Sequence, residues 1–309
     1  MAERFLVVLF QVITLFLMMG AGFILGKIKL LDEAGTKQAS AIIINVVTPC
    51  LVVSSLQIDL NAQLLQTMGK IALASFVCLL VNIAVAALHF RKEPEDDRVT
   101  MRFGAVFGNT GFMGIPLVAA VLGQETTLVA VIVIAVCSFL TYTYGVMIMG
   151  GKKAFSAKTL ASNPVLISII LGLALMFLRI KLPGPVGNAV STIAGINSPL
   201  AMITIGAQLS RADLSGIFSQ FRLYRVTVLR NILFPVLEAF ILLPLKLDRI
   251  TYIALVILMG TPTAGVTSIL SERYGRNYQL AAQLVSLTTI LSAVTLPFIA
   301  VLAETLAGN

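Results

Sequence analysis

The chain has 309 residues, of which 58% are hydrophobic and only 12% are charged. Soluble domains carry about 45–50% apolar and about 25% charged residues, so this composition excludes an ordinary soluble protein. The net charge of +8 would suggest a nucleic-acid partner in a soluble chain. Here the basic residues stand in loops beside apolar runs, which favours a role in membrane orientation and no nucleic-acid partner. Long apolar runs between short polar loops predict an all-α polytopic membrane protein surrounded by lipid bilayer.

Ten apolar stretches are each close to the ~20 residues that a spanning helix needs. The first is too long for a signal-peptide core of about 7–15 residues, so we read it as the first membrane helix. In chain order the expected spans are residues 5–26, 38–56, 68–90, 100–122, 125–150, 163–181, 187–210, 223–245, 249–271 and 278–305.

Basic residues are distributed unequally between the two sides that these spans define. If the loop after the first span is cytoplasmic, sixteen of the 22 Lys and Arg residues lie on that side. By the positive-inside rule, both termini are therefore expected on the non-cytoplasmic side of the cell membrane.

Two of the spans are interrupted by glycine and proline. The fourth contains GNTGFMGIP at residues 108–116, and the ninth contains GTPTAG at residues 260–265. Broken helices are tolerated at membrane depth only where they are buried in protein or line a wet cavity. Two such breaks at corresponding places in two halves indicate the binding site of a secondary transporter.

The two halves of the chain are alike in other respects. Asn45 and Pro49 in the second span correspond to Asn197 and Pro199 in the seventh, and the breaks are also about 150 residues apart. Five spans per repeat is an odd number, so the second repeat enters the membrane in the opposite direction. The sequence therefore predicts two inverted five-helix repeats, residues 1–150 and 151–309, within one membrane domain.

The first break is the stronger candidate for a binding site. Gly111 and its neighbouring glycines permit unwound backbone, and Pro116 removes a backbone donor. The half-helix that resumes after the break presents N–H groups and a positive dipole end, which favour an anion. Asn109 and Thr110 add donors without a buried charge. The alternative interpretation is a kinked, closely packed helix.

Other polar residues within the spans admit two interpretations. Thr261 and Thr263, on either side of Pro262, could bond the backbone groups that the proline frees, or could face a substrate or sodium ion. Asn45, Asn82 and Gln283 could line a cavity or bond a neighbouring helix.

Glu238 is the clearest ionisable residue inside a span, and such residues are functional candidates. It could bind a proton or cation, or it could be a structural partner. Arg230, two turns earlier, is expected to reach the cytoplasmic interface. The acidic run at residues 93–97 is expected to be a solvated loop.

The chain offers no catalytic constellation, no metal-ligand spacing and no cofactor motif, so an enzyme is not expected. The cysteines Cys50, Cys78 and Cys137 lie in apolar segments and are expected to pack there.

These motifs resemble the auxin efflux carrier family, whose members include plant PIN-type auxin exporters and bacterial permeases assigned to malate or malonate. The resemblance covers essentially the whole chain. Its most specific part is GNTGFMGIPL at residues 108–117. Further matching motifs are NVVTPCL at residues 45–51, PTA at 262–264, ERYG at 272–275 and TLP at 295–297.

The resemblance implies that the broken fourth and ninth helices cross. Helices 1, 2, 6 and 7 would form a scaffold, often dimeric, and helices 3–5 and 8–10 a transport domain that moves like an elevator. The substrate would be an organic anion whose carboxylate is held by Asn109. Plant members have an asparagine in the second break where this chain has residues 261–263, so a small carboxylate is expected rather than an aromatic auxin.

The favoured hypothesis is thus an alternating-access carrier for a small carboxylate anion, coupled to H⁺ through Glu238, coupled to Na⁺, or acting as a uniporter. A ligand-binding membrane sensor that does not transport is the alternative. A channel is disfavoured because no ring of like charges marks a pore.

Overall fold

The computed structural model describes residues 2–211 and 217–308, and these residues are helical apart from short turns and one isolated β-bridge. The first half contains α1 (Ala2–Lys27), α2 (Glu33–Ile42), η1 (Ile43–Val47), α3 (Thr48–Ser55), α4 (Ala62–His89), α5 (Glu95–Val106), η2 (Thr110–Gly114), α6 (Ile115–Leu122), η3 (Gln124–Thr126), α7 (Thr127–Leu140), η4 (Thr141–Gly145) and α8 (Val146–Gly150). The second contains η5 (Lys152–Ala154), α9 (Ala157–Ala161), α10 (Pro164–Phe177), α11 (Gly184–Gly195), α12 (Asn197–Arg211), α13 (Phe221–Val228), η6 (Leu229–Leu233), α14 (Phe234–Leu242), η7 (Leu243–Leu245), α15 (Arg249–Met259), α16 (Val266–Arg273) and α17 (Tyr278–Ala307).

Within the described residues, seven helical runs are long and apolar enough to cross a membrane. They are Leu9–Lys27, Glu33–Ser55, Ala62–His89, Gln124–Gly150, Gly184–Arg211, Phe221–Leu245 and Tyr278–Ala307. Shorter apolar helices, Thr110–Leu122, Pro164–Phe177 and Arg249–Met259, lie in the other three expected stretches. The polytopic helical membrane fold is therefore confirmed, while ten crossings in an inverted repeat stay a prediction.

Polar residues at loop ends determine where several of these helices begin. The side chains of Asp32, Asn61, Asn163, Asp248 and Asn277 each accept a hydrogen bond from a backbone N–H in the first turn of α2, α4, α10, α15 and α17. Such caps satisfy donors that the helix itself leaves unpaired. They stand at the polar ends of the apolar runs, where the sequence places its loops.

The closest helix packing joins α1 to α12. A Cβ atom on Gly22 would lie 2.0 Å from the carbonyl oxygen of Ile203, and one on Gly206 would lie 1.9 Å from that of Met19. Gly26 makes a similarly close approach to Ser210. Small residues spaced four apart let the two backbones touch, which is how membrane helices associate without a hydrophobic driving force.

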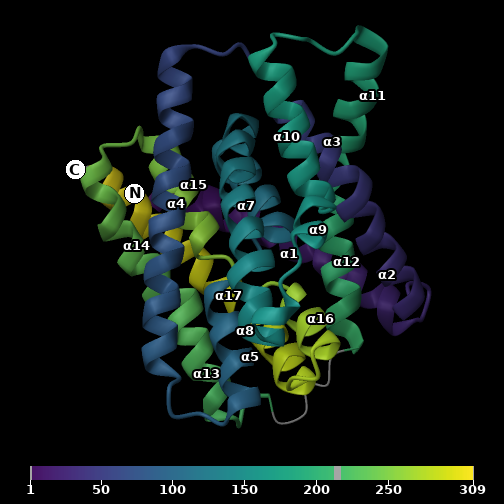
Figure 1. Ribbon diagram of the computed structural model, residues 1–309, viewed down its shortest axis with the longest axis vertical. Helices are drawn as coiled ribbons and strands as arrows, with labels where there is room; N and C mark the ends of the chain where they lie inside the picture. The colour runs from purple at the N-terminus through teal and green to yellow at the C-terminus, as the bar shows by residue number, and fades with distance from the viewer. Residues whose placement is uncertain (1, 212–216, 309) are drawn as a thin grey trace.

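Figure 1 shows how the helices are arranged around the core. Helix α4 runs along nearly the full height of the molecule, the turn between α10 and α11 is at the upper end, and α5 and α13 reach the lower end. Helix α3 packs against α10 and α11, whereas α17 packs against α13, α15 and α16. Every residue from 251 to 260 is buried, so α15 lies at the centre of the bundle.

The acidic turn, residues 93–97, comprises the end of the connection after α4 and the first turn of α5, and it is not simply the solvated loop that the sequence predicts. Its carboxylates form ion pairs with arginines of α13 and of the turn between α16 and α17. These pairs are Arg225 with Glu93, Arg222 with Asp97, and Arg276 with Asp96. The side-chain amide of Asn277 also donates to Asp97 over 2.7 Å. Three segments far apart in the sequence are thereby joined at this face.

Candidate functional site

The two breaks meet and pair with each other. The backbone N–H of Asn109 donates to the carbonyl of Pro262 over 2.7 Å, and that of Ala264 donates to the carbonyl of Phe107 over 3.0 Å. These bonds form the antiparallel bridge between Gly108 and Thr263. Each break thus satisfies backbone groups that the other has freed, as unwound backbone inside a membrane protein requires.

Arg230 lies at this crossing, which corrects the expectation that it reaches the cytoplasmic interface. Only 1% of its surface is exposed. The guanidinium donates from Nε to the carbonyl of Thr261 over 2.7 Å, from Nη1 to that of Val106 over 2.8 Å, and from Nη2 to that of Met259 over 2.8 Å. Val106 and Met259 end helices α5 and α15, so the cation faces the negative ends of two helix dipoles.

The guanidinium of Arg230 occupies the space that a side chain at residue 108 would fill, so this position requires glycine. A Cβ atom there would lie 1.8 Å from Nη2 of Arg230 and 2.8 Å from Oγ1 of Thr261. The sequence places residue 108 in a break but does not show which side chain packs against it. The one signal is that Arg230 lies in an apolar span, and the sequence does not show how deeply an arginine in such a span is buried.

On the first break, donors remain unengaged. Asn109 is half-buried, and its side-chain oxygen accepts from the N–H of Phe112 over 3.2 Å. Its amide nitrogen has no acceptor among the described residues, and neither do the backbone N–H groups of Thr110 and Gly111, which open the half-helix Thr110–Leu122. Thr110 is buried and Gly111 half-buried. This edge of the crossing therefore presents donors and a positive dipole end.

On the second break, the hydroxyl groups bond the backbone. Thr261 and Thr263 are fully buried, and they donate to the carbonyls of Leu258 over 2.7 Å and Gly104 over 2.8 Å. The N–H of Thr263 donates to Oγ1 of Thr288 on α17. Of the two interpretations of these threonines, the structure favours satisfaction of freed backbone groups.

Two further predicted site residues form their hydrogen bonds with groups outside the two breaks. Asn45 is exposed on η1 and donates to the carbonyl of Ala41 in its own helix over 2.8 Å. Gln283 is buried and accepts from Gln220 over 3.2 Å, close to the start of α17. Neither contacts the crossing through a hydrogen bond in the described part of the chain.

A cavity of about 570 Å³ adjoins the half-helix that follows the first break. Its polar lining comes from α3, η3, α7, α11 and α12 and includes Ser54, Ser55, Gln124, Glu125, Thr127, Ser191, Asn197 and Ser198. Pro116 lines it as well, whereas Asn109 does not. Both polar atoms of the buried Asn197 side chain and the hydroxyl of Thr127 lack a hydrogen-bond partner within residues 2–211 and 217–308. In the sequence, Asn197 is recognisable only as the counterpart of Asn45.

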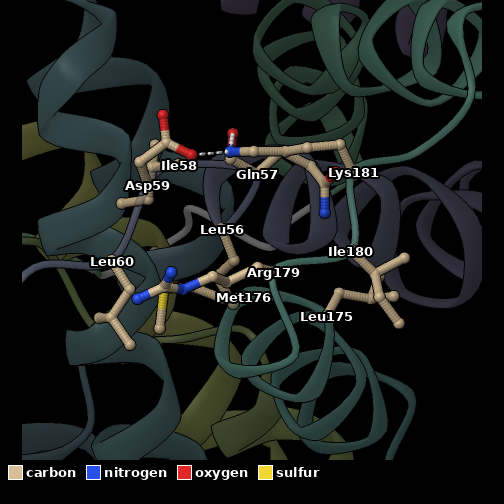
Figure 2. Close-up of a pocket in the computed structure, with 10 residues that line it drawn as sticks. All are labelled: Leu56, Gln57, Ile58, Asp59, Leu60, Leu175, Met176, Arg179, Ile180 and Lys181. Carbon is tan, nitrogen blue, oxygen red and sulfur yellow. Dashed lines mark hydrogen bonds and ion pairs between the residues drawn. The ribbon is translucent and has the colours of Figure 1, made fainter.

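A second cavity, of about 250 Å³, lies between the end of α3 and the end of α10 (Figure 2). Its polar groups bond one another: Lys181 contacts Asp59 over 2.9 Å and donates to the carbonyl of Gln57 over 3.1 Å. The hydrogen bond and charge of Lys181 lower the pKa of the Asp59 carboxyl. This cavity contains no residue of either break, so the larger one is the better candidate for a substrate.

Glu238 is fully buried on α14 and pairs with α4. Nδ2 of Asn82 donates to one of its carboxylate oxygens over 2.6 Å. In the described part of the chain, the other carboxylate oxygen and the amide oxygen of Asn82 have no hydrogen-bond partner. Asn82 thus bonds a neighbouring helix, and Glu238 remains a buried acid with one unsatisfied oxygen.

A helical membrane bundle with crossed broken helices beside a polar cavity is typical of membrane transport proteins. A family model described as "Membrane transport protein" matches residues 7–159 and 153–300. The chain therefore belongs to this family, the auxin efflux carrier-like family that the crossing motifs resemble, and it is a transporter rather than an enzyme.

Three curated relatives agree with this assignment. The chain is 26% identical over 286 residues to an uncharacterized transporter of Methanothermobacter thermautotrophicus, covering 89% of this chain and 92% of the relative. It is 26% identical over 275 residues to an uncharacterized transporter of Methanocaldococcus jannaschii, covering 85% and 88%. It is 25% identical over 224 residues to a protein of Rhizobium meliloti named "Putative malonate transporter", covering 69% of each chain.

Proposed function

We propose that this protein is a secondary transporter that moves a small carboxylate anion across the cytoplasmic membrane. The observation that carries the proposal is the asymmetry of the crossing. Its carbonyl groups are bonded by Arg230, whereas the amide of Asn109 and the first N–H groups of the following half-helix have no acceptor among the residues that the structure describes. Unengaged donors at a helix N-terminus favour an anion.

A carboxylate is the anion that best fits these donors. Its two oxygens can accept from the Asn109 amide and from backbone N–H groups at once, as ionised acceptors do in charge-assisted hydrogen bonds. The name of the Rhizobium relative refers to malonate, a small dicarboxylate, which supports the same substrate class. Thr110, Gly111 and Pro116 would complete this side of the site, with Thr261, Pro262 and Thr263 supporting it from behind.

Elevator-type alternating access is our proposal for the mechanism. The scaffold, helices 1, 2, 6 and 7, would comprise α1, α2 with α3, α10, and α11 with α12. Tight glycine contacts between α1 and α12 and the packing of α3 on α10 and α11 support this unit. The transport domain would comprise α4–α8 and α13–α17, and the ion pairs of the acidic turn support that grouping. The polar cavity lies where the two units meet.

The same proposal includes the predicted membrane arrangement. Two inverted repeats, residues 1–150 and 151–309, would place both termini on the non-cytoplasmic side, and scaffold helices of two copies would form a homodimer. The exposed apolar side chains of α1 and α10, among them Phe10, Leu17, Ile167 and Ile170, fit contact with lipid or with a second copy.

Proton coupling through Glu238 is the coupling that we favour. Glu238 is the one buried acid among the described residues, and one of its oxygens has no partner. Buried ionisable groups in membrane proteins commonly form proton relays. Transport without any coupling ion is the competing possibility.

The first test is thermal unfolding of the purified protein in detergent with a panel of carboxylates from malonate, malate, lactate and pyruvate to indole-3-acetate. A ligand at about 100 times its Kd stabilises the folded state by about 2.7 kcal/mol. We expect a small carboxylate to raise the melting temperature of the native protein and of Asn45→Ala, which alters an exposed residue away from the crossing. The shift should vanish in Asn109→Ala.

Flux measurements in proteoliposomes then separate transport from sensing. We expect the stabilising carboxylate to be taken up by vesicles that contain the protein. Binding without uptake would favour a membrane sensor, and the absence of any carboxylate shift in a cooperatively unfolding protein would contradict the proposed substrate class.

A further inference from the structure

We infer that Arg230 is a tethered cation that occupies the carbonyl cluster where a sodium-coupled carrier would bind its ion, so this carrier works without sodium. The inference deepens the proposed function, on which its transport part rests. Its structural part concerns the crossing alone and can be tested without a substrate.

The guanidinium has the surroundings of a bound metal cation. Three carbonyl oxygens, those of Val106, Met259 and Thr261, accept from it within 2.8 Å, and Oγ1 of Thr261 lies 3.5 Å from Nη2. Carbonyl and hydroxyl oxygens are the ligands that hard cations prefer. In broken-helix transporters, unwound carbonyls and half-helix C-terminal ends coordinate the coupling Na⁺. Here the same groups are already bonded to a side chain.

The local backbone is adapted to the side chain rather than to a small ion. Any Cβ at residue 108 would collide with the guanidinium, so glycine at this position provides the space for it. Arginine is fixed in its charged state and has five donors in a planar arrangement, so one residue can bond carbonyls of both broken helices.

The charge at the crossing is therefore permanent. A guanidinium remains protonated at physiological pH, so neither ion concentration nor pH changes the charge at this place. Glu238, two helical turns along the same helical run, is bonded by Asn82 rather than by Arg230. The anion that binds at the opposite edge would be attracted by Arg230 and by the half-helix dipole together, with no sodium ion required.

The experiment compares the native protein with Arg230→Ala in sodium chloride and in choline chloride at equal ionic strength. For the native protein, we expect the same melting temperature and the same carboxylate-induced shift in both salts. Arg230→Ala opens the carbonyl cluster, so its melting temperature should fall. Millimolar guanidinium, and sodium relative to choline, should restore at least half of that loss. Arg225→Ala, which removes an arginine from the half-buried pair with Glu93, outside the crossing, should respond to neither ion.

Three results would overturn the inference. First, the native protein could require sodium for stability or for carboxylate binding. Second, Arg230→Ala could lose stability but regain none of it with guanidinium or sodium. Third, Arg230→Ala could be as stable as the native protein. If Arg230→Ala does not fold, Arg230→Lys takes its place. The lysine ammonium cannot bond all three carbonyls, so sodium should raise the melting temperature of this variant relative to choline. If sodium has no such effect, the inference is wrong.

The outcome for the tethered cation is distinguishable from that for the proposed function. Failure of every carboxylate to stabilise the native protein would contradict the substrate class, whereas the guanidinium and sodium responses of unliganded Arg230→Ala would still decide the role of Arg230. In proteoliposomes, uptake by the native protein should be equal in the two salts.

Discussion

At the crossing, Arg230 provides a buried cation, and Asn109 is the residue that we propose binds the anion. Arg230 bonds the carbonyl groups of both broken helices, and Asn109 stands at the edge where donors remain unengaged. The two side chains come from helical segments more than 100 residues apart in the chain. We therefore expect loss of Arg230 to lower stability first, and loss of the Asn109 side chain to remove the proposed carboxylate binding.

Gly108→Ala tests the space that the guanidinium needs. The added methyl group would lie 1.8 Å from Arg230, so the guanidinium or the backbone must shift. Overpacking of this kind costs about 1–3 kcal/mol, and here it also breaks hydrogen bonds to a charged group. We expect a lower melting temperature and a loss of carboxylate uptake. Gly265→Ala in the second break has no atom within 4 Å of the new methyl group and should unfold like the native protein.

Glu238→Gln tests proton coupling. The amide can still accept from Asn82 through its oxygen, so the fold should persist. A side chain that cannot ionise also cannot exchange a proton, so carboxylate uptake should lose its dependence on pH. The measurement is uptake at several pH values by proteoliposomes with the native protein or the variant. Unchanged uptake and an unchanged pH profile would remove Glu238 from the mechanism.

At the scale of helices, three prolines share one local adjustment. Each follows a π-helical turn: η1 precedes Pro49, η2 precedes Pro116 and η6 precedes Pro235. In each turn the residue before the proline donates to the carbonyl five residues back. Proline lacks an N–H and its ring clashes with the preceding turn, and a widened turn relieves both effects.

The breaks illustrate how much of the site the sequence could predict. Glycine and proline weaken a helix through local physics, so residues 108–116 and 260–265 could be located from the chain, and both are broken in the structure. The position of Arg230 could not be predicted, because an apolar span conveys neither the depth of a charge nor its partners in other helices. The role of Thr261 and the exposure of Asn45 could not be predicted either, because both depend on how the helices pack together.

The contact between α1 and α12 gives a prediction at the helix scale. Gly22→Leu would place its side chain against the backbone of Ile203, which lies only 2.0 Å from the first added carbon. We expect the helices to separate and the melting temperature in detergent to fall. Gly20→Leu, on the same helix, has no atom within 4 Å of its Cβ and is the matched control. Equal stability of the two variants would contradict the close packing.

For the whole molecule, the polar cavity predicts access from one side of the membrane. Ser198 lines it, and in the proposed orientation the N-terminal end of α12 faces the non-cytoplasmic side. In a variant without native cysteines, Ser198→Cys should react with a membrane-impermeant thiol reagent added from outside, and a stabilising carboxylate should slow the reaction. Ser75→Cys, whose position is 1% exposed, should not react. Labelling of Ser198→Cys only from the cytoplasmic side would reverse the proposed orientation.

The hydrogen bonds of Arg230 also limit how the molecule can move. One side chain on η6 is bonded to the ends of α5 and α15, and the two breaks are paired backbone to backbone. Neither broken helix can shift alone without leaving a buried charge or carbonyl unsatisfied, which is costly in a membrane interior. The proposed alternating access must therefore move α5, α15 and the helical run containing Arg230 as one rigid body, with the hinges placed outside the crossing.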